Sequence, residues 1–209
     1  DIENADSEGK IQFPKIDLSV GPDVVRLPGL ELQDTLETLH VRYGEDGVIV
    51  VTRSNKRAVL FNGQIRTRVL WLEDDINSGD RLMVVRNDYF WLKDHEELPI
   101  DLIANGDMIE VSRIGSRFTR YGQEFAEVDV ILSDFPDYPS FSVTILLSIL
   151  HDSRPSLPQS ETKELYHAIA KDYSDLRTKS AIHKAVISDP CYRALQVKFA
   201  YSLTCHKAQ

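Results

Sequence analysis

Apolar positions in the first hundred residues alternate between runs that suit strands and spacings that suit helices. Helical spacing predicts an amphipathic helix over residues 30–43 and a second helix over about 55–72. Apolar runs predict a buried strand at 48–52 and another strand at 81–86, and a short strand is also predicted at 24–27. This succession of strand, polar corner and helix predicts an α/β domain with a covered, parallel sheet.

From residue 98 the pattern changes to short strands separated by turns, which indicates a small β module. Strands are predicted at 108–114, 124–132 and 141–150. Between the first two, residues 115–122 combine arginines with aromatic residues and predict the tip of a hairpin.

Helical spacing returns after the β module, over residues 160–187, and an alternating run then predicts a final strand at 196–202. We expect this strand to return to the first sheet, so that the β module is inserted within the α/β domain. The predicted parts are a first portion of the α/β domain at 1–100, the inserted module at 101–158, and the returning helix and strand at 159–209.

Charge and composition limit the classes of function. A formal net charge of -9 argues against binding nucleic acid by bulk attraction, so any such contact must be local. Cys191 and Cys205 lack the spacing of metal ligands and are expected to be reduced thiols. With no apolar run long enough for a membrane and no leader pattern, we expect a cytoplasmic protein with no membrane partner. The start at Asp1 and the polar half-turn at the end predict a fragment of a longer protein.

Candidate chemistry is concentrated just after two strands. The final strand leads into Tyr201-Ser-Leu-Thr-Cys-His-Lys-Ala-Gln209, where a hydroxyl, an imidazole, an ammonium and an amide suit anionic oxygens. The strand at 48–52 leads into Arg53-Ser-Asn-Lys-Arg57, where Ser54 or Asn55 can cap a helix and the basic side chains can be solvated. From the residues alone, a solvated corner is the simpler interpretation of both segments.

Three motifs occur in order along the chain. The first is Val51-Thr-Arg-Ser-Asn-Lys-Arg-Ala58, which matches T-x-[ST]-N. The second is Gly79-Asp-Arg-Leu-Met-Val-Val-Arg-Asn-Asp88 with Ile103-Ala-Asn-Gly-Asp107, which matches G-D-x-[VL]-M-x-x-x-N and an N-G-[DE] turn. The third is the segment from Tyr201 to Gln209. Together they resemble the C-terminal half of superfamily 1 DNA helicases of the UvrD/RecD-like group, whose motif V is similar to the third segment.

The resemblance implies a fold and a set of contacts. It implies a partial RecA-like domain, called 2A, that is interrupted by a small SH3-like β-barrel module, called 2B. It implies an ATP-dependent helicase that translocates on single-stranded DNA. The residues it implies for binding that strand are Arg53, Asn55, Thr204, His206 and Lys207. Gln209 leads toward the segment that faces the nucleotide in the family.

The chain also departs from the family pattern. G-x-x-x-x-G-K-[ST] does not occur, and no Asp-Glu pair can be assigned to magnesium, so ATP and Mg2+ are expected only in the full-length parent. The chain alone is expected to lack ATPase activity and to bind single-stranded DNA weakly. Its other expected partners are the missing N-terminal RecA-like domain and a second copy, through apolar surface near the final strand.

An alternative function is a non-enzymatic interaction module that binds a protein partner through an SH3-like β domain. The two hypotheses place the binding surface differently. A helicase origin predicts that Asn55 and His206 face one groove. The interaction module predicts an exposed apolar or aromatic patch on the β module.

Overall fold

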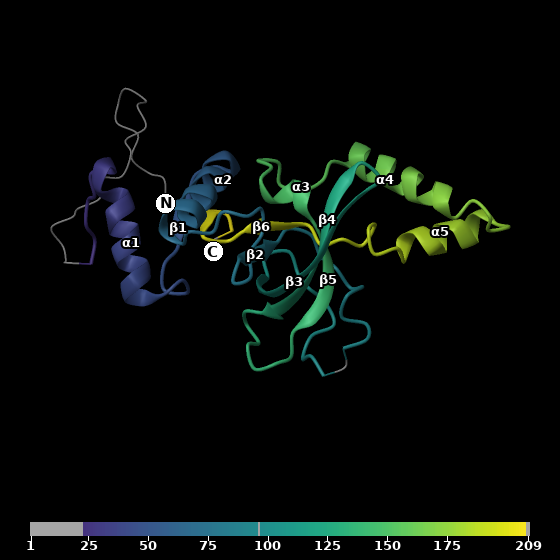
Figure 1. Ribbon diagram of the computed structural model, residues 1–209, viewed down its shortest axis with the longest axis horizontal. Helices are drawn as coiled ribbons and strands as arrows, with labels where there is room; N and C mark the ends of the chain where they lie inside the picture. The colour runs from purple at the N-terminus through teal and green to yellow at the C-terminus, as the bar shows by residue number, and fades with distance from the viewer. Residues whose placement is uncertain (1–22, 96, 208–209) are drawn as a thin grey trace, which may run out of the picture.

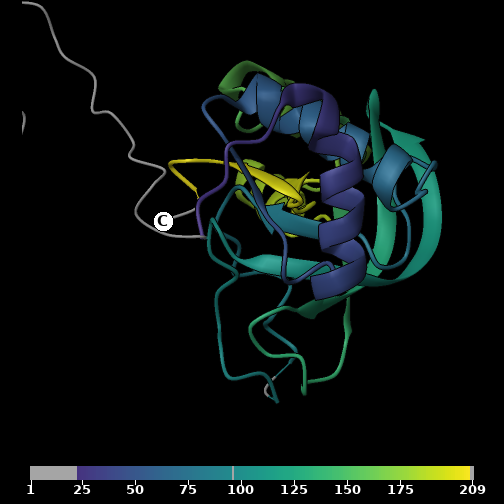
Figure 2. The same cartoon turned by 90° about the vertical axis from the view of Figure 1, so that its left-hand side faces the viewer.

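A computed structural model describes residues 23–95 and 97–207 and contains both helices and strands, the latter in two sheets (Figure 1). The chain has an elongated form, with α1 and α5 at opposite ends of its long axis. Seen from the end that carries α1, this helix lies in front of the rest of the molecule (Figure 2).

The N-terminal part contains helices around one short strand. A 3-10 turn, η1, precedes α1, and a π-helical turn, η2, directly continues α2. The elements are η1 (Gly29–Glu31), α1 (Leu32–Tyr43), β1 (Val50–Thr52), α2 (Asn55–Gln64) and η2 (Ile65–Val69). The side chain of Ser54 accepts a hydrogen bond from the backbone N–H of Arg57, so α2 begins directly after β1.

The smaller sheet pairs β1 with β7 (Ser202–Thr204) in parallel. Val50 lies opposite Ser202, and Thr52 lies opposite Thr204. The predicted return of the final strand to the first strand is therefore confirmed for the end of that segment, from Ser202 onward. The predicted burial of the first strand is confirmed only in part, since Val51 is 53% exposed.

The larger sheet has five antiparallel strands in the order β5-β4-β3-β2-β6. They are β2 (Arg81–Val84), β3 (Met108–Arg120), β4 (Gln123–Leu132), β5 (Phe141–Leu146) and β6 (Val197–Phe199). The sheet closes on itself, because Ile145 of β5 forms a parallel bridge with Leu195, just before β6. Two register shifts between β3 and β4 add the bends that such closure needs.

Sheet membership differs from the prediction at two strands. The strand predicted at 81–86 was assigned to the α/β part, but β2 pairs with β3 and β6 of the larger sheet. The final strand predicted at 196–202 is divided into β6 and β7, which belong to different sheets. The predicted boundaries after residues 100 and 158 consequently lie between strands that share one sheet.

Several elements also differ in extent. The strand predicted at 24–27 is absent from the described residues. The hairpin tip predicted at 115–122 is confirmed in place but not in length, because β3 continues to Arg120 and only Tyr121 and Gly122 form the turn to β4. The strand predicted at 141–150 ends at Leu146 and continues as a helical turn. The helix predicted at 160–187 is broken into two. These helices are α3 (Leu147–Leu150), α4 (Gln159–Asp172) and α5 (Lys179–Ile187).

One hydrophobic core joins the two sheets. It includes Leu36 of α1, Ile65 of η2, Leu82 of β2 and Val130 of β4. A second core packs α4 and α5 against Phe125, Leu146 and Ile149 at the far side of the larger sheet. The pair of helices therefore belongs with the β module in its packing.

None of the helices within residues 23–95 and 97–207 combines the length and the apolar character needed to cross a membrane. Cys191 and Cys205 are both free thiols, as predicted.

Candidate functional site

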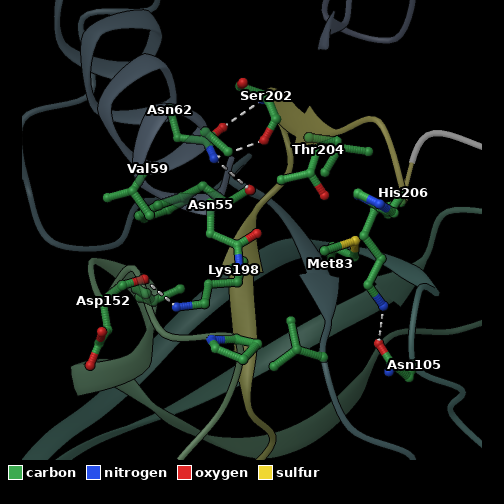
Figure 3. Close-up of a pocket in the computed structure, with 17 residues that line it drawn as sticks. Asn55, Val59, Asn62, Met83, Asn105, Asp152, Lys198, Ser202, Thr204 and His206 are labelled. Carbon is green, nitrogen blue, oxygen red and sulfur yellow. Dashed lines mark hydrogen bonds between the residues drawn. The ribbon is translucent and has the colours of Figure 1, made fainter. Parts of the chain in front are cut away.

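A cavity of about 360 Å³ lies between α2 and β7 on one side and the larger sheet on the other (Figure 3). It brings together the ends of the smaller sheet, the start of α2 and residues of β2 and β6. Four of the residues predicted from the sequence line it: Asn55, Thr204, His206 and Lys207.

Parallel pairing explains why the two predicted segments meet. The carboxyl ends of parallel neighbours lie at the same edge of a sheet, so the residues that follow β1 and β7 emerge together. The backbone N–H of Cys205 donates to the Thr52 carbonyl at 2.9 Å, and Thr52 Oγ1 donates to the Leu203 carbonyl at 3.3 Å. These bonds extend the pairing of β1 with β7 as far as Cys205, the residue before His206.

Asn62 fixes β7 against α2 from the middle of the helix. Its Nδ2 donates to the carbonyls of Phe199 and Ser202 at 2.9 and 3.0 Å, and its Oδ1 accepts from the Ser202 N–H at 2.6 Å. The side chain is buried. It therefore provides the hydrogen bonds that the chain needs where it leaves one sheet and enters the other.

The predicted residues have different environments. Thr204 is buried, whereas Asn55 and His206 are exposed at the cavity. Lys207 is also exposed, and its Nζ donates to Asn105 Oδ1 of the β2–β3 connection at 2.5 Å. Arg53 is exposed but does not line the cavity. Gln209 lies outside the described residues.

Two lining residues, Ser202 and Lys198, were not singled out from the sequence. Ser202 is 1% exposed, and its Oγ is the one buried side-chain oxygen or nitrogen without a hydrogen-bond partner in the described part of the chain. The Lys198 ammonium donates to the backbone carbonyls of Ile149 and Asp152. Burial lowers the pKa of Lys198 to about 8, although the Asp152 carboxylate acts in the opposite direction.

The sequence contains a weak signal for these residues. Polar side chains at Lys198 and Ser202 interrupt a run of apolar ones in the final strand, and Asn62 lies two helical turns after Asn55. The sequence pattern does not show that these residues lie close together, because α2 and β6 are far apart in the sequence and come together only in the folded chain.

A buried network joins the segment between β6 and β7 to the start of β2. Arg66 and Asp80 form an ion pair, and Tyr201 donates its hydroxyl proton to Asp80 Oδ1 at 3.1 Å. The same hydroxyl accepts from the Arg81 N–H at 3.2 Å. Burial, followed by the Asp80 charge, raises the pKa of Tyr201, so this phenol stays a donor. Tyr201, between β6 and β7, is thereby tied to the start of β2.

The charged residues that line the cavity are Lys198, Lys207 and Asp152, and further cations follow β1 outside it. The first turn of α2 has no acidic residue, and Arg53, Lys56, Arg57 and Lys207 lie near the same sheet edge. Within residues 23–95 and 97–207 no three His, Cys, Asp or Glu side chains form a group that could hold a metal ion. The arrangement suits an anionic group at the mouth and an apolar group inside.

Comparison with protein-family models found no family that matches the chain, and comparison with curated proteins found no matching sequence.

Proposed function

We propose that the chain is the 2A/2B portion of an ATP-dependent superfamily 1 DNA helicase of the UvrD/RecD-like group, and that the corner formed by β1, β7 and α2 contacts single-stranded DNA. The proposal is carried by one observation. Asn55 and His206, from two motifs that are about 150 residues apart, line the same cavity. A shared groove is the arrangement that a helicase origin predicts.

The architecture supports this assignment. In this proposal the parallel β1–β7 pair with α2 is the partial RecA-like domain, and the closed five-stranded antiparallel sheet is the SH3-like 2B module. Between β6 and β7 the chain passes from the larger sheet to the smaller one. This passage agrees with an inserted module whose chain then returns to its parent domain.

Exposed apolar side chains also agree with it. Most of the large exposed ones in the described residues belong to the N-terminal part: Val24, Val25, Leu30, Val41, Tyr43, Ile49, Val51, Leu60 and Trp71. On the five-stranded module and its loops the corresponding residues are Tyr89 and Tyr138, which lie in separate loops. The interaction-module alternative placed its patch there, so this distribution favours contact of the α/β part with the missing RecA-like domain or with a second copy.

Contacts with the strand follow from the donors at the corner. The Lys207 ammonium and the His206 imidazole can bind phosphate oxygens, and the Asn55 amide and Thr204 hydroxyl can bind either phosphate or a base edge. The N-terminus of α2 adds a partial positive charge. Because few cations contribute and the net charge is -9, affinity is expected to be weak and sensitive to salt.

ATP and Mg2+ belong to the full-length parent in this proposal, where ATP hydrolysis supplies the energy for translocation. The described residues offer no group suited to magnesium, and Gln209, the residue assigned to the nucleotide side, lies outside them. The role of this half in the proposal is to hold the strand.

The proposal is tested by fluorescence anisotropy of a labelled single-stranded oligonucleotide at low and moderate salt. Wild type is expected to bind with salt-dependent affinity, and Asn55→Ala/His206→Ala to lose most of it. A second pair compares equal changes in charge: Arg53→Ala/Lys207→Ala at the corner and Lys163→Ala/Lys171→Ala on exposed positions of α4. If both double variants lost the same affinity, the binding would be non-specific electrostatic attraction without a defined site. Absence of binding would contradict the proposal for this chain.

A further inference from the structure

We propose that the cavity between α2, β7 and the larger sheet is a pocket for one unstacked nucleobase of the bound strand. This inference rests on the proposed function and deepens it. It assigns the interior of the cavity, whereas the contacts above concern its mouth.

The size and walls of the cavity suit a planar ring. Its volume of about 360 Å³ is within the range of small-molecule pockets. Ala58 and Val59 of α2 form one wall, and Met83 of β2 and Leu203 of β7 also line it. Apolar side chains favour the face of a base, which is poorly hydrated compared with a phosphate or a sugar, and a methionine adapts to ring edges.

An unpaired hydroxyl marks the interior as a polar recognition point. Ser202 is among the residues that line the cavity, and its Oγ is buried and lacks a partner among the described residues. A buried hydroxyl without a hydrogen bond costs free energy, so a ligand that pairs with it gains that amount on binding. Serine both donates and accepts, which matches the mixed donors and acceptors on a base edge.

Lys198 adds a donor at the same cavity. Its ammonium has three N–H groups, of which two are used by the carbonyls of Ile149 and Asp152. The third remains for a ligand acceptor. An exocyclic carbonyl oxygen, as in thymine, is the base group that this donor suits, so a thymidine strand is the appropriate probe.

The position of the cavity explains how a base reaches it. Thr204 and His206, two of the residues assigned to the strand, both line the cavity, and His206 is exposed there (Figure 3). A backbone held there places one base beside the opening. The remaining bases stay outside, so the pocket acts on one nucleotide of the bound segment.

The test uses the shortest labelled oligothymidylate that retains full affinity, with a single abasic site moved one position at a time. One position is expected to lower affinity about tenfold, the scale of losing one well-packed base, while other positions change it little. This scan uses the wild-type chain and does not depend on the folding of any variant.

A matched pair of variants locates the effect. Val59→Phe fills the cavity, whereas Leu60→Phe adds the same ring at the next position, which is 58% exposed and does not line it. Val59→Phe is expected to bind the intact strand about tenfold more weakly and to lose its sensitivity to the abasic position. Leu60→Phe should behave as wild type.

The outcomes separate the two proposals. In one outcome, binding depends on Asn55 and His206 and yet is unchanged by every abasic position and by Val59→Phe. That result would overturn the base pocket and leave the proposed function in place. If no single-stranded DNA is bound, both are contradicted.

Discussion

The guanidinium of Arg66 forms a two-point ion pair with the carboxylate of Asp80, at 2.7 and 2.8 Å, and both side chains are almost completely buried, at 3% and 0% exposure. Arg66 also donates to the Asp74 carbonyl and to Asn77 Oδ1, and its guanidinium lies 4.1 Å from the centre of the Phe199 ring. The pair therefore joins the π-helical turn after α2 to the start of β2.

Breaking this pair should strongly destabilise the fold. Arg66→Ala or Asp80→Ala leaves a buried charge without its partner, and the free energy of unfolding is expected to fall by about 3–5 kcal/mol in urea titrations. The comparison is Arg113→Ala, which removes a pair with Asp129 in which Arg113 is 70% exposed, and which should cost less than about 1 kcal/mol. Equal losses for the buried and the exposed pair would contradict the assignment.

Asn62 should matter for both stability and DNA binding. Asn62→Ala leaves the Ser202 N–H and the carbonyls of Phe199 and Ser202 without their partner, so we expect a loss of about 2–3 kcal/mol. Because β7 is then less well fixed, single-strand affinity should fall as well. The control is Asn105→Ala, an exposed asparagine, whose effect on unfolding should stay near about 0.5 kcal/mol. An unchanged unfolding midpoint for Asn62→Ala would show that these bonds are replaced by water.

Trp71 occupies a backbone conformation that suits glycine. Its φ is 58°, one residue beyond the C-cap Leu70 of η2, where the Leu72 N–H donates to the Arg66 carbonyl in the manner of a helix C-terminal cap. The indole is 75% exposed, so little packing offsets the strain. Trp71→Gly is expected to raise the free energy of unfolding by about 1 kcal/mol.

Trp71→Ala separates backbone strain from loss of the indole. It removes the ring but keeps a Cβ at the same φ, so thermal unfolding should show no comparable gain. A glycine variant less stable than the alanine variant would mean that the strain is not the dominant effect.

Lys198 predicts a specific dependence of stability on pH. Its folded pKa of about 8 lies below its ordinary 10.5, so between these values the unfolded chain binds more protons than the folded one. The free energy of unfolding should therefore rise with pH over this interval, relative to Lys198→Met, which cannot titrate there. Urea titrations of both proteins across the interval measure the difference. A difference that falls with rising pH would show that the two carbonyl bonds to the ammonium outweigh its burial.

The local parts of the fold could be predicted from the sequence, and their assembly only in part. Helical spacing around Leu36 predicts α1 closely, because one face of that helix contacts the core. The division of the final strand is not visible, since apolar residues continue through Ala200 and Tyr201 while the chain changes partners. Which sheet a strand joins depends on distant residues, and periodicity does not record them.

The same reason explains why the hairpin tip is shorter than the predicted range. Arg117 and Arg120 suggested a solvated turn, but their partners are the Ile76 carbonyl and Asp172, which are far away in sequence. At the candidate site, the resemblance brought out Asn55 and His206, which share a cavity. It did not bring out Ser202, because a buried hydroxyl without a partner is a property of packing.

The pairing of β1 with β7 has a consequence for the order of folding. Thr52 and Leu203, which bond across this pair, are 151 residues apart, and closing so long a loop is entropically costly unless the intervening chain is already compact. Within the larger sheet β3, β4 and β5 are joined by two hairpins, so we expect these strands to form first. Pairing of β6 with β2 then brings β7 beside β1. The cavity and the corner formed by β1, β7 and α2 would then be among the last features to appear during folding, and hydrogen exchange at Val50 and Cys205 should be protected later than in β3 and β4.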